Sequence, residues 1–578
     1  MVSTNGNSAY FGRDQASNKR RGAKKILPWG RYSTMSRHFE SSSAKRRRFR
    51  IAALLIVFPG VLHAQARPGA DEVLHVDARA EGTAFPHYWE KVFGSGRAIL
   101  SLRDSYRSDM RSIKQVTSFQ AVRFHGIFMD EVGLYDPDRK PIQFAQMKNA
   151  DAMAPENAGI YNFSYIDQIY DGLLDNGIRP FVELSFMPKK MASDPNALHA
   201  FWYKQNVSPP RDYAVWDAMI TAFAQHLVDR YGLEEVSHWD FEVWNEPNID
   251  FWAGKPAQAS YFELYDHTAL AIKNVSSRLR VGGPSTAQAA WTGDFLRHCK
   301  EMNIPVDFAS SHVYANDTAK DVFHTDEVIP RDHMVCRSVR KVHDEIAASP
   351  LPSTPLIFSE YNASYANEPN VTDTIYMGPW LATTISQCDG LTESMSYWTF
   401  SDVFEEQGVV KTPFYGGFGL LATDSIPKPA FNAFAMLHLL GDRRLPLASD
   451  SALATRRSDG ALAIALWNYA PPDGTGATYT PPPAKHGPTK SFTVHVAGVP
   501  SGARASILRL DEDHGNVMKA YDSMGRPAFP SRDQIKELRE AAKPSTPEQT
   551  ALKDSSLTIR VPAQGLVLVT IENPKAAR

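Results

Sequence analysis

Short apolar runs alternate with longer amphipathic stretches between residues 85 and 441. The short runs have the length and the β-branched or aromatic content of strands, and stretches such as Tyr213–Tyr231 and Ala259–Ser277 have helical periodicity. The predicted strands are Lys91–Ser95, Ala121–Phe128, Arg179–Ser185, His238–Asn245, Leu279–Pro284, Asp307–Tyr314, Pro355–Asn362 and Ser394–Ser401. Eight strands that alternate with helices predict a (β/α)8 TIM barrel over residues 85–441.

A doubly wound open sheet is the alternative architecture for this alternation of strands and helices. Such a sheet carries a glycine-rich, phosphate-binding turn after its first strand. Gly94 and Gly96 lie at that point, but the third glycine of a GxGxxG turn is missing. The barrel is therefore the better prediction.

The pattern changes after about residue 441 to short alternating strands separated by turns rich in proline and glycine. It predicts an appended antiparallel β-sandwich over residues 442–578. Another alternating run, Val73–Arg79, lies in the segment 67–84 and is expected to add a strand to this sandwich. Residues 524–550 are expected to form a mobile helical insertion. The strands predicted for the sandwich are Ala461–Tyr469, Lys490–Val496, Ala503–Arg509, Ser556–Val561 and Gly565–Ile571.

Residues 1–66 have the organisation of an export signal. A basic region is followed by the apolar segment Ile51–Leu62 and by Ala64-Gln65-Ala66, which has the form of a cleavage site. The apolar segment has 12 residues, whereas roughly 20 are needed to span a bilayer. We expect a cleaved signal peptide, a periplasmic or secreted protein, and no stable membrane insertion; the alternative is an uncleaved anchor. The basic region is long for a signal, so Met35 is an alternative start to Met1.

The composition is that of a soluble globular protein, with 43% hydrophobic and 22% charged residues. A formal net charge of −2 over 578 residues predicts no nucleic-acid partner. The three cysteines, Cys299, Cys336 and Cys388, are too few and too scattered for a disulfide framework, and their redox state stays open. Because no Cys/His spacing typical of a metal site occurs, neither a metal nor another cofactor is expected.

Active-site residues of a barrel gather at the carboxyl ends of its strands, and two of the predicted strands have a glutamate at or near that end. Glu246 stands directly before Pro247, which ends the fourth strand because proline cannot donate to the ladder. Glu360 comes at the end of the apolar run Pro355–Phe358 in the seventh strand. A structural ion pair is the alternative for each residue taken alone. Two glutamates on nearly opposite strands are, however, what double-displacement cleavage of a glycosidic bond requires.

Two further acids of the fourth strand, Asp240 and Glu242, share the face of Glu246 but lie deeper along the strand. Acidic side chains are rarely buried without a partner. We therefore expect both to be buried partners of arginine or histidine rather than catalytic residues.

The segment Phe241–Asn248, which reads FEVWNEPN, resembles the acid/base motif of glycoside hydrolase family 39, the β-xylosidases and α-L-iduronidases. This resemblance covers about residues 71–573 and implies a retaining glycosidase with a (β/α)8 barrel. It also implies that Glu246 is the general acid/base, Glu360 the nucleophile, and Asn245 a ligand of the sugar 2-hydroxyl. The supporting matches are Val92–Gly96, Arg123–Gly126, Ser311–Tyr314, Phe358–Asn362 and Tyr397–Asp402.

Further residues at the strand ends are expected to bind substrate. His125 and His312 resemble donors to sugar hydroxyls, and Trp398 resembles the platform beneath the sugar ring; structural histidines and a core tryptophan are the alternatives. Tyr314 is expected to donate its hydroxyl to the nucleophile. Glu405 is expected to reach sugar hydroxyls, and the alternative for it is a solvated acidic pair with its neighbour.

The loops after the sixth and eighth predicted strands indicate which kind of sugar the site would bind. Asn316-Asp317 and Asp402–Gln407 make an acidic neighbourhood, which suits a neutral pentose better than a uronic acid. A β-xylosidase acting on xylo-oligosaccharides is therefore the favoured prediction. An α-L-iduronidase stays open, because Lys411 or Arg123 could reach a uronate. An endo-acting hydrolase of the same clan stays open, because loop length decides between a cleft and a pocket. The alternative from another class is a non-catalytic carbohydrate-binding barrel, which would lack one of the two glutamates that are both present here. The oligomeric state stays open.

Overall fold

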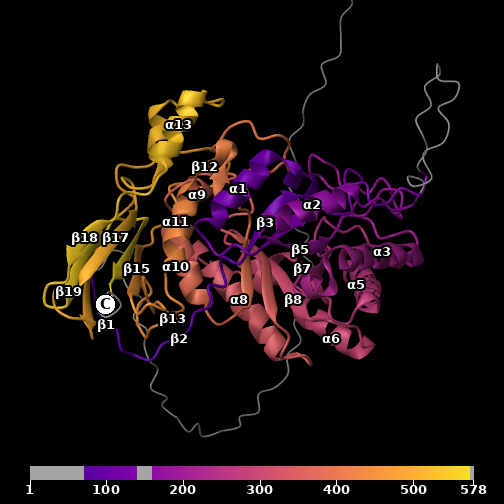
Figure 1. Ribbon diagram of the computed structural model, residues 1–578, viewed down its shortest axis with the longest axis horizontal. Coiled ribbons are helices and arrows are strands. Elements are labelled where there is room, and N and C mark those ends of the chain that lie inside the picture. Colours follow the sequence, from indigo (N-terminus) through magenta and orange to yellow (C-terminus); the bar gives the residue numbers. More distant parts are fainter. Residues whose placement is uncertain (1–70, 139–158, 573–578) are drawn as a thin grey trace, which may run out of the picture. The chain divides into compact units, whose positions relative to one another are not determined.

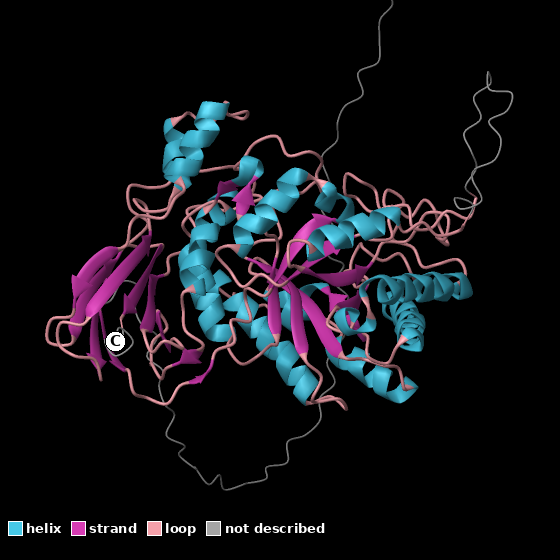
Figure 2. Cartoon of the chain, viewed as in Figure 1, coloured by secondary structure: helices cyan, strands magenta, loops and turns pink. Residues whose placement is uncertain are grey.

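A closed, wholly parallel barrel forms the centre of the protein (Figures 1 and 2). The computed structural model describes residues 71–138 and 159–572, so the predicted signal segment 1–66 lies outside the described residues. Neighbouring strands follow the order β10-β3-β4-β5-β6-β7-β8-β9, which confirms the predicted barrel. Its strands are β3 (Val92–Arg97), β4 (Ala121–His125), β5 (Arg179–Leu184), β6 (Asp240–Val243), β7 (Arg280–Thr286), β8 (Phe308–Tyr314), β9 (Leu356–Asn362) and β10 (Ser394–Tyr397).

Helices surround the barrel strands, as Figure 2 shows. Helix α3 begins and ends where its periodicity predicts, and the Asp212 side chain caps it by accepting from the Ala214 amide. The longer helices are α1 (Asp104–Lys114), α2 (Ser164–Leu174), α3 (Tyr213–Tyr231), α5 (Ala257–Val275), α6 (Thr292–Met302), α8 (Arg331–Ala347), α10 (Met377–Cys388) and α11 (Pro429–His438). Short ones are α4 (Leu233–Val236), α7 (Ala319–Phe323) and α9 (Pro369–Thr372). Single turns of 3-10 helix are η1 (Ala98–Leu102), η3 (Ala287–Ala289) and η4 (Thr423–Ser425).

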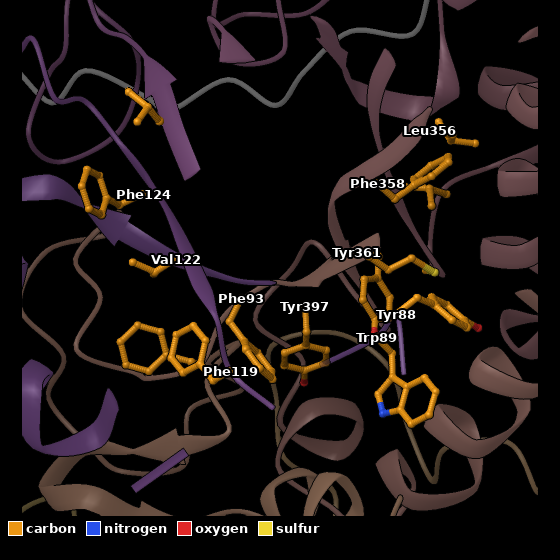
Figure 3. Close-up of a cluster of buried hydrophobic side chains, with 14 of the residues drawn as sticks. Tyr88, Trp89, Phe93, Phe119, Val122, Phe124, Leu356, Phe358, Tyr361 and Tyr397 are labelled. Carbon is orange, nitrogen blue, oxygen red and sulfur yellow. The ribbon is translucent and has the colours of Figure 1, made fainter. Parts of the chain in front are cut away.

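The pleat of the strands divides the barrel core into an inner and an outer layer. Val92 joins an interior cluster with the rings of Phe181 and Phe308. Its neighbour Phe93 points the other way and packs against Phe119, with ring centroids 4.9 Å apart (Figure 3). Apolar residues on both faces are what strands of a parallel barrel need, because the lumen and the helix layer are both dry.

Two further sheets, built from strands before and after the barrel in the chain, share one hydrophobic cluster. The larger has the order β18-β17-β20-β15-β14-β13-β2, and the smaller the order β1-β16-β19. All five strands predicted after residue 441 are present. The bounds are β1 (Glu72–Asp77), β2 (Thr83–Ala84), β13 (Arg443–Arg444), β14 (Ala452–Arg456), β15 (Leu462–Asn468), β16 (Lys490–Ala497), β17 (Arg504–Leu510), β18 (Glu548–Ala551), β19 (Ser556–Val561) and β20 (Gly565–Ile571). A small hairpin joins β11 (Leu421–Ala422) to β12 (Ile426–Pro427).

The amino-terminal strand corrects one expectation about these sheets. Strand β1 joins them as predicted, but it pairs with β16 in parallel, with Leu74 beside Val494, so the sandwich is not wholly antiparallel. The parallel pair is possible because the two strands are far apart in the chain, and no short hairpin constrains their direction. The expected insertion 524–550 contains helix α13 (Arg532–Ala541), preceded by α12 (Val517–Ser523), but it ends in strand β18.

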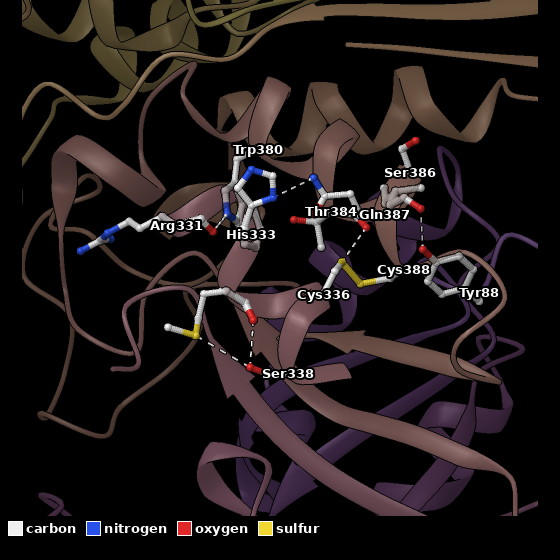
Figure 4. The surroundings of a disulfide bond; sticks show 12 residues. Tyr88, Arg331, His333, Cys336, Ser338, Trp380, Thr384, Ser386, Gln387 and Cys388 are labelled. Carbon is white, nitrogen blue, oxygen red and sulfur yellow. Dashed lines mark hydrogen bonds between the residues drawn. A yellow bond between two sulfur atoms is a disulfide. The ribbon is translucent and has the colours of Figure 1, made fainter. Parts of the chain in front are cut away.

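A disulfide joins Cys336 of α8 to Cys388 at the end of α10 (Figure 4). The spacing of the cysteines in the chain does not indicate this pairing. Cys299 is a free, buried thiol. No helix among the described residues is long and apolar enough to cross a membrane.

Candidate active site

A cavity of about 520 Å³ opens at the carboxyl ends of the barrel strands. Both predicted catalytic glutamates line it, together with four of the predicted substrate-binding residues: His125, Asn245, Tyr314 and Trp398. These side chains come from the ends of β4, β6, β8, β9 and β10, so the barrel brings together residues that are scattered along the chain. The cavity therefore lies where this fold carries its chemistry.

Glu246 is held by an unusual backbone turn after β6. Its φ is 45° and that of Trp244 is 71°, in the left-handed region that side chains other than glycine rarely adopt. The Glu246 amide donates to the Ser285 carbonyl oxygen at 2.8 Å, and the Trp244 indole donates to the Phe251 carbonyl oxygen at 2.8 Å. These bonds hold a strained turn, which is a feature that clusters at functional sites.

The two glutamates are close enough to act on one bond. One carboxyl oxygen of Glu246, one of Glu360 and a ring nitrogen of His312 lie within 4.8 Å of one another. Retaining glycosidases hold their two carboxyl groups about 5–5.5 Å apart, whereas inverting enzymes need roughly 6.5–9.5 Å to admit a water molecule. The geometry fits the shorter, retaining separation.

Two donors hold the carboxylate of Glu360. Arg123 donates to its Oε1 at 2.7 Å and the Tyr314 hydroxyl donates to its Oε2 at 2.5 Å. The ring nitrogen Nε2 of His125 lies 3.9 Å from the same Oε1. Burial raises the pKa of Glu360 above its usual value, and the charge of Arg123, then that of His125 and then the Tyr314 hydrogen bond oppose this rise. These contacts stabilise the ionised form that a nucleophile needs.

The environment of Glu246 differs, because Arg123 bonds to Glu360 and not to Glu246. Its side chain is buried, and burial, then the charge of Glu360 and then that of Asp317 raise its pKa well above the usual range. His312 Nδ1 lies 3.0 Å from its Oε1, and burial lowers the pKa of this imidazole well below its usual value, so the ring is neutral. Of the two carboxyl groups, Glu246 therefore retains the proton, as a general acid must.

Arg123 organises the floor of the site and was not assigned there from the sequence. It is wholly buried and also donates to Glu242 at 2.6 Å and to the Asn245 side-chain oxygen at 2.9 Å. The expectation that Glu242 is a buried partner of arginine is thus confirmed. Asp240 also pairs with an arginine, Arg280 at 3.1 Å, but it is half-buried and not buried as expected. A single arginine within the apolar strand β4 was the available signal, because a buried guanidinium requires carboxylate partners.

The prediction that His312 donates to a sugar hydroxyl is corrected by the structure, because this residue does not line the cavity. Its side chain is fully buried, and its Nε2 lies 3.1 Å from the Ser359 hydroxyl and 3.2 Å from the Ser285 hydroxyl. With both ring nitrogens engaged by the protein, it cannot also donate to a sugar. Its place is behind Glu246, which it orients.

Glu405 is the second correction. Its carboxylate accepts from Arg97 at 2.7 Å and from Arg103 at 2.6 Å, and it does not line the cavity. Its neighbour Glu406 lines the cavity instead. Burial and the nearby charge of Glu360 raise the pKa of Glu406 well above the usual range. The loop after β10 thus turns one acid inward to arginines and the other toward the substrate.

Trp398 reaches the cavity because of a glycine on the first strand. A Cβ atom added to Gly94 would lie 2.2 Å from Cε3 of the Trp398 ring, so no larger residue fits there without displacing the indole. The ring is also 4.7 Å from that of His125. The two strands that close the barrel therefore set the position of this aromatic surface.

Several lining residues escaped sequence reasoning because they lie on long loops without periodicity. His199 stacks on Phe251 with ring centroids 4.0 Å apart, and both face the cavity with Phe201. Tyr365 lies at the mouth and is 56% exposed. No short motif marks these positions. They add an aromatic wall to the predicted site.

Two groups of histidine and carboxylate atoms among the described residues are close enough together to bind a metal ion. One is the set Glu246, His312 and Glu360. A cation there would occupy the lone pairs that the two glutamates use on a glycosidic bond. The other set lies outside the cavity.

Comparison with known proteins agrees with this site. The family model "Glycosyl hydrolases family 39" matches residues 72–556. A β-xylosidase of Geobacillus stearothermophilus is 37% identical over 503 residues, covering 84% of this chain and 93% of that protein. The crystal structure of a monomeric β-xylosidase from Caulobacter crescentus CB15 superposes with a TM-score of 0.76 at 32% identity, covering 87% of this chain and all of that one.

A more distant relative belongs to the other activity that the motif suggested. The human α-L-iduronidase is 24% identical over 426 residues, covering 66% of this chain and 62% of that protein. The family match spans most of the described chain, and the relative from Geobacillus is similar over nearly its whole length. The chain is a glycoside hydrolase that belongs to glycosyl hydrolase family 39.

Proposed function

We propose that the protein is a retaining β-xylosidase that removes xylose from the ends of xylo-oligosaccharides. The observation that carries this proposal is the pair Glu246 and Glu360, held at short separation in one cavity, with Arg123 bonded to Glu360 alone of the two. The similarity to two β-xylosidases supports the choice of sugar.

In the first step, Glu360 attacks the anomeric carbon while Glu246 protonates the leaving oxygen. The attack forms a bond from the Glu360 carboxylate to the anomeric carbon and breaks the glycosidic bond. Arg123 and Tyr314 hold both oxygens of the nucleophile, which fixes its direction of attack. The Asn245 side-chain oxygen accepts from Arg123, which leaves its amide group to donate to the sugar 2-hydroxyl.

In the second step, Glu246 acts as a base and removes a proton from water, which attacks the anomeric carbon and releases Glu360. Once Glu360 is an ester it has lost its charge, so one cause of the raised pKa of Glu246 disappears. The same side chain thus changes from acid to base at the moment the reaction needs it.

The charge of the cavity favours a neutral sugar. Among its described lining residues are the carboxyl groups of Glu246, Asp250, Asp317, Glu360 and Glu406, but no lysine or arginine. Arg123 is buried against its carboxylate partners beneath the site, and Lys411 lines a separate cavity. A uronate entering this site would find no cation to pair with. We infer that a neutral pentoside is preferred to an iduronide.

A panel of nitrophenyl glycosides tests this function. We expect the β-D-xyloside to be cleaved with the highest kcat/KM, the α-L-iduronide to be a poor substrate, and NMR to show β-xylose as the first product. Glu246→Gln and Glu360→Gln should each lose several orders of magnitude in kcat. Cleavage of the iduronide in preference would overturn the sugar, and α-xylose as first product would overturn the retaining mechanism. No hydrolysis at all would favour a binding protein.

We also propose that the protein is exported and cleaved near Ala66. The support is the basic, apolar and A-x-A order of residues 1–66, together with the Cys336–Cys388 disulfide, since disulfides persist in oxidising compartments. Amino-terminal sequencing of the protein from its native host should begin near Arg67. An intact Met1 or Met35 would overturn the proposal.

A further inference from the structure

A second cluster of ligand-type side chains lies at the opposite end of the barrel from the cavity. Glu90 stands just before β3, at the amino-terminal end of the strands, and His87 precedes it in the same segment. His438 is the last residue of α11 and lies 348 positions further along the chain than Glu90. The fold brings together two imidazoles and a carboxylate that no short motif links.

The ligand atoms converge closely. His87 Nδ1 lies 2.7 Å from Glu90 Oε1, and His438 Nδ1 lies 2.9 Å from each oxygen of the same carboxylate. One atom from each residue falls within 4.8 Å of the other two. Both imidazoles thus direct the same ring nitrogen, Nδ1, at a shared point.

Glu90 is unusual for a buried acid. Its exposed fraction is 0%, and its ion-pair partners are the two histidines. Fully buried carboxylates normally pair with arginine or lysine, or bind a metal ion. The cation whose charge acts on His438 is Arg457, which is itself paired with Asp459 at 3.8 Å. The buried acid is therefore surrounded by groups that serve equally as metal ligands.

The surroundings of His87 resemble those of a metal-binding histidine. Its second ring nitrogen, Nε2, lies 3.4 Å from the Gly441 carbonyl oxygen, a backbone acceptor of the kind that fixes the tautomer of metal ligands. Its ring packs on Trp89 with centroids 4.4 Å apart, and its φ of 51° is a strained value for a residue other than glycine. The side chain is thus held in one orientation at some cost to the backbone.

We propose that His87, Glu90 and His438 bind a zinc ion. Two imidazole nitrogens and a carboxylate oxygen are a common protein ligand set for Zn²⁺, and water completes the tetrahedron. Ligand atoms on a tetrahedral zinc ion lie roughly 3.3 Å apart. The observed 2.7–2.9 Å therefore requires a small outward movement. His438 can make it because its side chain is 36% exposed, which also gives the water ligand access.

The position explains what the metal would do. The ion would connect the segment that enters the first barrel strand to the end of the last barrel helix, next to the point where β2 pairs with β13. It would therefore hold the two ends of the barrel segment of the chain together. This inference does not depend on the proposed sugar specificity, because none of the three residues lines the cavity.

Metal-stripped protein titrated with Zn²⁺ and Co²⁺ tests the site. Calorimetry should show that one equivalent of zinc binds per chain. The bound zinc should raise the Tm and leave the rate of xyloside hydrolysis unchanged. Co²⁺ should give the visible absorption of a tetrahedral site with nitrogen and oxygen ligands. His438→Ala should weaken this binding by at least the roughly 10- to 100-fold that loss of an outer-shell partner costs, since it removes a ligand itself. His343→Ala, which removes an exposed histidine of α8, is the matched control and should bind zinc like the unchanged protein.

Three outcomes would overturn the proposal. The first is that zinc binds only between the catalytic glutamates. Zinc would then inhibit hydrolysis, and His438→Ala would not change the zinc affinity. The second is a protein that binds no zinc at micromolar concentration. If His438→Ala does not fold by circular dichroism, Glu90→Gln and His87→Ala carry the test. The third outcome is an unchanged zinc affinity in any of these three variants that folds, and it would refute the site.

Discussion

Replacing Tyr314 by phenylalanine isolates one contribution to the ionisation of the nucleophile. The change removes a hydroxyl that donates to Glu360 Oε2 at 2.5 Å and leaves the ring in place. A hydrogen bond to a charged group is worth about 1.5–3 kcal/mol. Because one pKa unit corresponds to about 1.36 kcal/mol, the loss should move the pKa of Glu360 by roughly 1–2 units.

The direction of this pKa change follows from the protonation state of Glu360 that the Tyr314 hydrogen bond favours. The hydroxyl stabilises the carboxylate and so lowers the pKa, and its removal raises the pKa of Glu360. The acidic limb of the kcat/KM profile reports ionisation in the free enzyme. We therefore expect this limb to move to higher pH by about 1–2 units. At a pH below the new limb, kcat/KM should fall by roughly ten- to a hundredfold.

The assay is the pH dependence of kcat/KM on an activated aryl β-xyloside. Tyr365→Phe is the matched control, because its ring lies 6.1 Å from that of Tyr314 at the cavity mouth. The control should keep the acidic limb of the unchanged enzyme. If Tyr314→Phe keeps it as well, the hydrogen bond does not set the ionisation of Glu360, and the reasoning fails.

Three further predictions concern other parts of the molecule. With azide and an aryl xyloside, Glu246→Ala should recover turnover and give the β-azide, whereas Glu360→Ala should give the α-azide; the reverse products would exchange the two roles. Gly94→Ala should lower the free energy of unfolding by about 1–3 kcal/mol and raise KM, because the methyl group displaces the indole beside it. Gly293→Ala is its control, because the new methyl would meet no atom within 4 Å apart from the adjacent residues and the backbone of its own helix; equal losses in the two variants would contradict the packing argument. Removing the disulfide, which joins residues 52 apart, by paired Cys→Ser changes should cost about 4 kcal/mol of stability in urea unfolding; an unchanged midpoint would contradict it.

The barrel and its two glutamates could be predicted because both depend on local pattern. Each strand is marked by a short apolar run, and the end of a strand is also the place where a barrel carries chemistry. Glu246 and Glu360 stand at such ends. Only the residues next to each glutamate in the chain are needed to recognise it.

The rest depends on contacts between residues far apart in the chain. Arg123 reaches Glu360 across 237 positions, and nothing near either residue indicates the other. The loop after β10 has no periodicity, so the sequence could not show that Glu405 pairs with Arg97 while Glu406 lines the cavity. The disulfide escaped for the same reason, because its two helices meet only in the folded barrel.

The two donors that hold Glu360 have a consequence for engineering. When the carboxylate is removed, as in Glu360→Gly, the Arg123 guanidinium and the Tyr314 hydroxyl still point into the space it occupied. Two donors of this kind around an empty volume form a receptor for a small anion. Formate or fluoride should bind there. The Glu360→Gly variant should therefore serve as a glycosynthase, an enzyme that forms xylosidic bonds from an activated α-xylosyl donor and does not hydrolyse them.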